Sequence, residues 1–305
     1  MSEPDELYTL RNLFWLGNFQ LAITEANGLK KCPANLEIDK KEYYFKSYLG
    51  LGQHDVVLGE ISDSDPLVLR AVKIMAHVNS SSDSSARDNA ISQIQGWLDD
   101  NESMSNQTPN TIASLQLTMA TLLALDGPQG ADLKAAVKCI HTAQTMEHQV
   151  MLVQLYLRMD RVDIAQKQVM KMKQIDEDCT LTTMAQAWVN LASQPQKAQE
   201  AAYIYEELSD KYGASCMLLN GQAAAKMHLG AYDEAETLLT DALNKNPGDN
   251  DTLANLIVVG QHISRDEEIT QRYLTQLKKQ APNHQLVTAL AIFEGAFDRV
   301  GKTLM

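Results

Sequence analysis

The chain has 305 residues, of which 45% are hydrophobic and 21% charged, and its formal net charge is −13 at pH 7. These proportions are those of a folded protein and exclude global disorder. The acidic balance disfavours nucleic-acid and anionic membrane surfaces, which attract clustered lysine and arginine, and favours a protein partner.

The cysteines are far apart in the sequence and form no CxxC pair, so we expect a reducing, cytosolic environment. They are Cys32, Cys139, Cys179 and Cys216. The acidic N-terminus predicts no secretory signal, because it lacks a basic segment followed by an apolar one. No apolar run approaches the roughly 20 residues of a membrane span, so direct membrane insertion is not expected.

Two faint helix-turn-helix copies are predicted at the start of the chain. The first covers residues 5–30, with Gly17 in the turn and Ala22 on the second helix. The second covers residues 39–61, with Gly52 in the turn. We interpret residues 1–108 as weaker, irregular N-terminal repeats.

Four amphipathic segments in the next part of the chain predict helices. They are residues 66–79, 85–100, 109–125 and 131–146. The last two form a pair around the Gly127-Pro128 break. The polar stretches 79–85 and 101–108 predict solvated loops. The alternative for the first, which is rich in serine, is a phosphorylation site.

The clearest helix-turn-helix unit is residues 216–249. Gly230 marks its turn, and small residues at Ala223 and Ala235 allow the two helices to approach closely. Tyr232 fills the wedge between them. These features resemble the tetratricopeptide repeat.

Three further units share the register of this one, at a period of about 34 residues. The equivalent positions are Ala165, Ala201, Ala235 and Ile269. Such a period predicts an all-α fold, a tetratricopeptide-like α-solenoid that forms a right-handed superhelix of antiparallel helix pairs. We expect one solenoid over residues 1–305, with the clearer array and a C-terminal helix in residues 109–305.

The first helix of each pair is expected to line the concave inner wall of the solenoid, where a partner binds. The candidate partner-binding residues are Gln186, Asn190, Met217, Asn220, Ala224 and Met227. Most of them are short or uncharged, so the groove suits an apolar or hydrogen-bonding partner. The alternative is that several of them pack between helices.

No motif in the sequence indicates catalysis, and we expect no catalytic, cofactor-binding or metal-binding residues. Gly295–Thr303 resembles a phosphate loop, but its spacing is one residue too long and no helix follows it. Cys139 and His141 are two positions apart on a predicted helix, so they point to different faces. No histidine pattern with zinc spacing occurs.

The chain resembles the coatomer epsilon subunit family over its full length, and five segments carry this resemblance. They are residues 5–27, 42–53, 148–168, 199–236 and 290–300. The resemblance implies a non-enzymatic subunit of the COPI vesicle coat, whose superhelix curls around the C-terminal domain of the alpha subunit and stabilises it. It also implies the other coatomer subunits as partners and recruitment to membranes through an Arf-type GTPase.

The same resemblance implies Golgi-to-ER retrograde and intra-Golgi transport, with the protein in the cytoplasm and peripheral on Golgi membranes and COPI-coated vesicles. Nucleic acid is not an expected partner.

Two other functions compete with this one. A co-chaperone or general scaffold adaptor would bind a peptide in the groove. The common acidic-peptide mode needs lysine and arginine there, and the predicted wall has none. A hydrolase or transferase would need a cluster of titratable groups in a pocket, which the sequence does not indicate.

Overall fold

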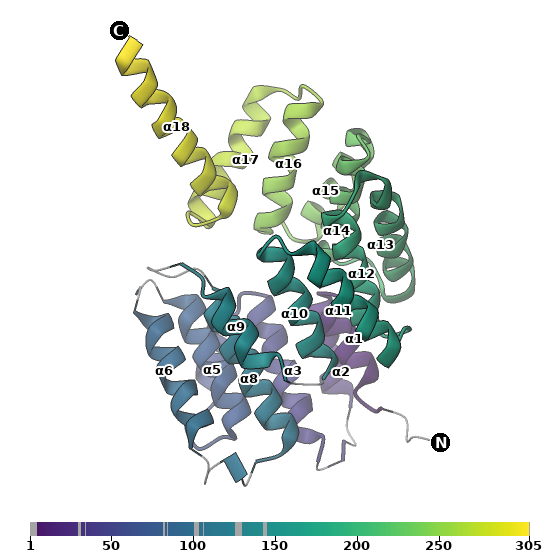
Figure 1. Cartoon of the computed structure of the whole chain (residues 1–305), viewed down its shortest axis with the longest axis vertical. Coiled ribbons are helices and arrows are strands. Elements are labelled where there is room, and N and C mark those ends of the chain that lie inside the picture. The colour runs from purple at the N-terminus through teal and green to yellow at the C-terminus, as the bar shows by residue number, and fades with distance from the viewer. Residues whose placement is uncertain are drawn as a thin grey trace. The chain divides into compact units, whose positions relative to one another are not determined.

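The computed structural model describes most of the chain. The described residues are 5–29, 32–33, 35–81, 83, 85–100, 104–105, 107–125, 130–142 and 145–304, with side chains up to Gly301. All regular elements in these ranges are helices, so the predicted all-α class is confirmed. Figure 1 shows the helices as consecutive antiparallel pairs.

The chain divides into two compact units, Met1–Ala192 and Ser193–Met305. The helices of the first unit are α1 (Tyr8–Trp15), α2 (Phe19–Gly28), α3 (Glu37–Gly50), α4 (His54–Glu60), α5 (Leu67–Ser80), α6 (Ala86–Asp99), α8 (Pro109–Ala124), α9 (Leu133–Ile140), α10 (Met146–Arg158), α11 (Val162–Ile175) and α12 (Thr180–Ala192). The second unit holds η1 (Pro195–Lys197), α13 (Ala198–Tyr212), α14 (Cys216–His228), α15 (Tyr232–Lys245), α16 (Asn250–His262), α17 (Glu267–Gln280) and α18 (Gln285–Leu304).

The helices predicted over residues 66–125 are confirmed as α5, α6 and α8. The segment 131–146 is helical over a shorter range than predicted, Leu133–Ile140. Thr145 accepts a hydrogen bond from the backbone N–H of His148 and caps the following helix, so the end of that segment already belongs to α10. The Gly127-Pro128 break lies outside the described residues, as do residues 101–103 and 106 of the stretch 101–108.

Five helix pairs share a tight turn in which one residue has a positive φ. These residues are Gly17, Gly52, Asp160, Gly230 and Ser264, with φ between 52° and 76°. In each turn the next residue donates its backbone N–H to the carbonyl five residues earlier, over 2.8–3.0 Å. This is the closing bond of the Schellman motif. The turns predicted at Gly17, Gly52 and Gly230 are therefore confirmed.

Because a side chain strains a residue at positive φ, we expect Ser264→Gly to stabilise the protein by about 0.5–1 kcal/mol. Asp160→Gly should give a smaller gain, since aspartate tolerates this conformation better than serine. Urea unfolding measures both effects. Gly230→Ala is the matched reverse change and should destabilise the protein by about 1 kcal/mol. A loss of stability in Ser264→Gly would contradict the turn assignment.

Small residues allow close helix packing in the second unit. Ala223 and Ala235 are fully buried in one cluster, against which Tyr232 packs, as the sequence predicted. At Gly221 the ring of Tyr205 fills the place of a side chain: a Cβ built there would be 2.5 Å from the ring carbons Cε1 and Cζ. The approach of α13 to α14 therefore depends on a glycine.

In the first unit the first helices of successive pairs form a closed series. The chain of neighbours runs α1, α3, α5, α8, α10 and α12, and α12 in turn contacts α1. Thr180 at the start of α12 donates its hydroxyl to the side-chain oxygen of Asn12 on α1, over 2.5 Å. The helices α5, α6, α8 and α9 lie side by side in Figure 1. This closure brings side chains of α1, α3, α8 and α10 together.

The described pairs and turns confirm the tetratricopeptide-like class. A single solenoid over residues 1–305, with a weaker part over 1–108 and a clearer part over 109–305, stays a prediction.

Candidate partner-binding surfaces

The predicted inner-wall residues of α12 are bonded to each other. Gln186 donates its side-chain amide to Asn190 Oδ1 over 2.7 Å. Asn190 is only 1% exposed, and Gln186 is half-buried. Asn190 therefore offers almost no surface to a partner and supports the helix packing instead.

Asn220 on α14 is also engaged inside the protein. Its amide nitrogen is 2.9 Å from the carbonyl oxygen of Cys216 and 2.7 Å from the hydroxyl of Thr252. Its amide oxygen accepts from Asn255, over 2.8 Å. With 9% of its surface exposed, Asn220 joins α14 to α16, because a buried amide must satisfy its hydrogen bonds inside the protein.

The other three predicted residues differ in their access to solvent. Met227 is partly buried against the cluster that contains Ala223, and Ala224 is half-buried. Met217 is 38% exposed, the highest exposure among the six predicted residues. Contact of any of the six with a partner stays a prediction, and Met217 is the residue best placed to test it.

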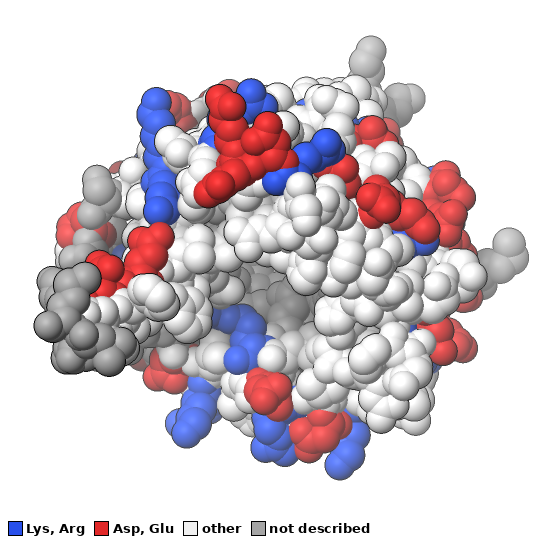
Figure 2. All heavy atoms as spheres, turned by 90° about the horizontal axis from the view of Figure 1, so that it is seen from above, with Lys and Arg blue, Asp and Glu red and all other residues white. Residues whose placement is uncertain are grey.

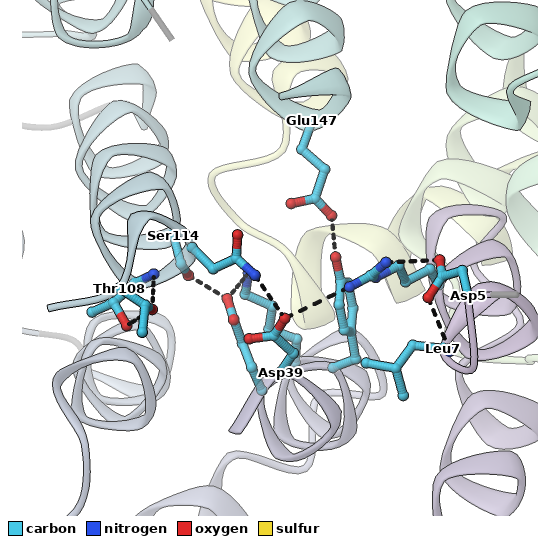
Figure 3. A network of polar contacts seen from close by, with 12 residues as sticks. Asp5, Leu7, Asp39, Thr108, Ser114 and Glu147 are labelled. Carbon is cyan, nitrogen blue, oxygen red and sulfur yellow. Dashed lines mark hydrogen bonds and ion pairs between the residues drawn. The ribbon is translucent and has the colours of Figure 1, made fainter. Parts of the chain in front are cut away.

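Side chains of α1, α3, α8 and α10 form a polar network that the sequence did not reveal (Figure 3). On its α1 side, Arg11 forms ion pairs with Asp5, at 2.8 Å, and with Asp39 of α3, at 3.6 Å. Asn110 of α8 donates to Asp39 over 3.0 Å. Asp39 therefore connects α3 to two other helices.

Glu42 forms the buried centre of this network. Its side chain accepts a short hydrogen bond from Ser114 of α8 and pairs with Lys46 at 2.5 Å. Glu42 is 7% exposed, so this pairing compensates a carboxylate removed from water. Burial, and then the negative charge of Glu42, raise the pKa of Asp39 above its ordinary value.

Glu147 of α10 accepts two hydrogen bonds at one oxygen. The indole N–H of Trp15 and the hydroxyl of Tyr43 each donate to Glu147 Oε1 over 2.7 Å. Burial, and then the neighbouring Glu147 charge, raise the pKa of Tyr43 well above its ordinary value. Tyr43 therefore stays a hydrogen-bond donor at neutral pH.

Apart from Asp5 and Lys46, the side chains of this network line a cleft of about 300 Å³. Its titratable groups are bonded to each other, and the Ser114 hydroxyl donates to the Glu42 carboxylate, which also pairs with Lys46, so the arrangement supports the contacts between α1, α3, α8 and α10. One feature of the sequence could have indicated this polar network. Asp39, Glu42, Tyr43 and Lys46 recur at helical spacing and place polar groups on one face of α3.

His148 lies beside this network and is fully buried. Burial lowers the pKa of His148 below 6.5, although the Glu147 charge acts in the opposite direction. A histidine with a lowered folded-state pKa contributes stability above its unfolded pKa of about 6.5 and loses it as pH falls. We therefore expect the free energy of unfolding to fall between pH 7.5 and pH 5.5.

Chemical denaturation at several pH values measures this dependence. His148→Leu removes the titrating group, so its stability should change less with pH over the same interval, whatever its absolute stability. An equal pH dependence in the two proteins would contradict the assignment to His148.

Neither a metal site nor a membrane span is found in the described part of the chain. There, no three His, Cys, Asp or Glu side chains gather as metal ligands, and no helix is long and apolar enough to cross a membrane. Cys139 and His141 have separate partners, the carbonyl oxygens of Gln116 and Lys138. The Gly295–Thr303 segment is helical, not a phosphate-binding loop.

Charges of both signs are mixed on the face of the molecule drawn in Figure 2. On the face drawn in Figure 2, lysine and arginine are interspersed with aspartate and glutamate, and the coloured, described residues there form no broad basic area. A nucleic-acid backbone needs such an area.

Comparison with known proteins decides the family. The family model described as coatomer epsilon subunit matches residues 3–304. The chain belongs to the coatomer epsilon subunit family. It is 38% identical to coatomer subunit epsilon-2 of Arabidopsis thaliana over 97% of this chain and 96% of that protein. It is 38% identical to coatomer subunit epsilon-1 of Oryza sativa subsp. japonica over 98% of both chains.

A solved structure supports the fold. The crystal structure of the APC/C hetero-tetramer Cut9-Hcn1 resembles this chain with a TM-score of 0.57 at 14% identity. The similarity covers 91% of this chain and 53% of that one, so this chain spans about half the length of its structural neighbour. The family predicted from the sequence is confirmed. The chain is therefore a component of coatomer, the COPI coat.

Proposed function

We propose that this protein is a non-enzymatic coat subunit that binds the C-terminal domain of the coatomer alpha subunit and stabilises it within the coat. In this function it takes part in Golgi-to-ER retrograde and intra-Golgi transport. It is located in the cytoplasm and peripherally on Golgi membranes and COPI-coated vesicles. Recruitment to the membrane is indirect, through an Arf-type GTPase and the assembled coat.

The observation that carries this proposal is the family match over residues 3–304, which spans nearly the whole of this chain. The fold supports it as well. Stacked helix pairs form an extended wall, which suits protein binding. The polar cleft of the first unit has its titratable side chains bonded to one another, which supports a binding function over a catalytic one.

The cleft also favours this proposal over an adaptor for acidic peptides. Its lining holds three carboxylates, those of Asp39, Glu42 and Glu147, and the cation Arg11. Lys46 pairs with Glu42 but does not line the cleft. An acidic peptide tail would be repelled there, whereas adaptors of that kind use arginine and lysine to pair with carboxylates.

Binding of the purified C-terminal domain of the alpha subunit tests the proposal. We expect a stable complex with the wild-type chain in size-exclusion chromatography and isothermal titration. Met217→Asp introduces a charge at the accessible inner-wall position and should weaken binding about tenfold. The absence of a complex with the wild-type chain would overturn the proposed function.

Tyr203→Asp is the matched control for the inner-wall assignment. Tyr203 is 61% exposed and lies on α13, near Ala201, which is equivalent to Ala235 in the repeat register, so we expect it on a second helix and away from the inner wall. The control should bind like the wild type. Equal weakening by both variants would count against the inner wall as the contact surface. Titration with a peptide that ends in acidic residues should give no binding.

A further inference from the structure

The last helix of the second unit exposes an unusual amount of apolar surface. Near its start α18 is anchored, because Val287 is buried in a core cluster with Leu253 and Leu277. Beyond this point the helix leads away from α16 and α17 (Figure 1). Ile292, Phe293, Phe297 and Val300 are between 58% and 82% exposed.

The apolar residues of α18 follow a heptad pattern. Leu286, Leu290, Phe293, Phe297 and Val300 succeed one another at intervals of four, three, four and three residues. This spacing places them along one stripe of the helix and is the repeat by which two helices pack knobs into holes. The chemistry of the stripe therefore calls for another helix rather than an extended peptide or a small molecule.

The position of α18 at the end of the repeat array strengthens this interpretation. A terminal helix of a solenoid ordinarily carries a polar outer face, since nothing stacks on it. Here Phe293 and Phe297, the two largest side chains of the stripe, are 70% and 82% exposed. An apolar patch of this kind on a soluble protein marks an interaction site.

The edges of the stripe differ in charge. At 100° per residue, Glu294 and Asp298 border one edge, whereas Ala289 and Ala296 border the other. Lys278 approaches Glu294 only to 3.9 Å with both side chains exposed, so the acidic edge is weakly compensated. A helix that fits this surface has lysine or arginine beside its apolar stripe, on the side that faces Glu294 and Asp298.

A second copy of this chain does not supply lysine or arginine opposite Glu294. In an antiparallel pair centred on Gly295, Glu294 would oppose Glu294 of the other copy, and in a parallel pair it would oppose Ala289. The charge pattern therefore favours a different protein.

We propose that the apolar stripe of α18 docks an amphipathic helix with one basic edge, contributed by the C-terminal domain of the coatomer alpha subunit. This inference rests on the proposed function and adds to it a second contact surface, separate from the inner wall. It predicts that the exposed rings of Phe293 and Phe297 contribute to affinity without contributing to the stability of the free chain.

Isothermal titration of the purified full-length chain with the purified C-terminal domain of the alpha subunit tests this proposal. Phe293→Asp combined with Phe297→Asp should weaken binding at least tenfold. The melting temperature of the free variant should stay that of the wild type, since both rings are exposed. The matched control is Thr288→Asp with Ala291→Asp, which adds the same charge on the other side of α18 and should bind like the wild type.

The charge of the acidic edge is tested separately. Glu294→Lys with Asp298→Lys should weaken binding about fivefold and reduce its dependence on salt. Unchanged or stronger binding by this variant would contradict the basic edge assigned to the partner helix.

The outcomes separate this inference from the proposed function. If the wild-type chain does not bind the alpha domain, the proposed function fails. If the wild type binds and the double aspartate variant binds equally well, the inference about α18 fails and the proposed function stands. A wild-type dimer in light scattering that the Phe293 and Phe297 changes dissociate would assign the stripe to a second copy and overturn the proposal.

Discussion

Gly221→Ala is expected to destabilise the protein by about 1–3 kcal/mol, although alanine is the better helix former. The added Cβ would be 2.5 Å from the ring carbons Cε1 and Cζ of Tyr205, well inside van der Waals contact. Tyr205 is 3% exposed, so its ring cannot swing into solvent to make room. The helices α13 and α14 must therefore separate or shift. Urea unfolding at constant pH measures the loss.

Gly96→Ala provides a control in which the same substitution is expected to raise the stability instead of lowering it. Gly96 lies inside α6, and nothing is within 4 Å of a Cβ built there. Removing the conformational freedom of glycine should stabilise that helix by about 0.5–1 kcal/mol. A gain of stability in both variants would show that α13 and α14 do not approach as closely as the Tyr205 contact requires.

The repeats could be predicted from the sequence because their signals are local. A turn at Gly17, Gly52 or Gly230 needs one residue at positive φ, and glycine supplies it at a fixed place in each unit. Small residues such as Ala223 and Ala235 reveal close helix contacts in the same way. A period of about 34 residues then extends one recognisable unit into an array.

The direction in which individual side chains point was predicted less accurately than the repeats. Asn190 and Asn220 were placed on the first helices correctly, yet both are buried and hydrogen-bonded within the protein. On a helix, neighbouring positions differ by about 100°, so a small error in register separates the inner wall from a contact between helices. Polar residues at such contacts resemble surface residues in a single sequence.

The polar network of the first unit was missed for a different reason. Glu147 is 132 residues from Trp15 and 104 residues from Tyr43 in the sequence. Nothing local in the sequence shows that α1, α3 and α10 meet, since this contact results from the closure of the series of first helices. Until that closure is known, a charged residue on a first helix could face either solvent or a neighbouring helix.

Glu147→Leu is expected to destabilise the protein by about 2–4 kcal/mol. The change removes the acceptor of two hydrogen bonds at once and leaves the indole N–H of Trp15 and the hydroxyl of Tyr43 unpaired. Tyr43 is 7% exposed, so water cannot replace the lost bond fully. Urea unfolding measures the stability, and near-ultraviolet circular dichroism reports the changed surroundings of the two aromatic rings.

Glu147→Gln separates the acceptor from its charge. The glutamine carbonyl oxygen can accept both hydrogen bonds, and the change leaves the ion pairs of Asp39 with Arg11 and of Glu42 with Lys46 in place. We therefore expect this variant to lose less than about 1 kcal/mol, because the acceptor is retained and one repulsive charge is gone. Equal losses in the leucine and glutamine variants would show that the negative charge of Glu147, rather than its two hydrogen bonds, holds α10 to α1 and α3.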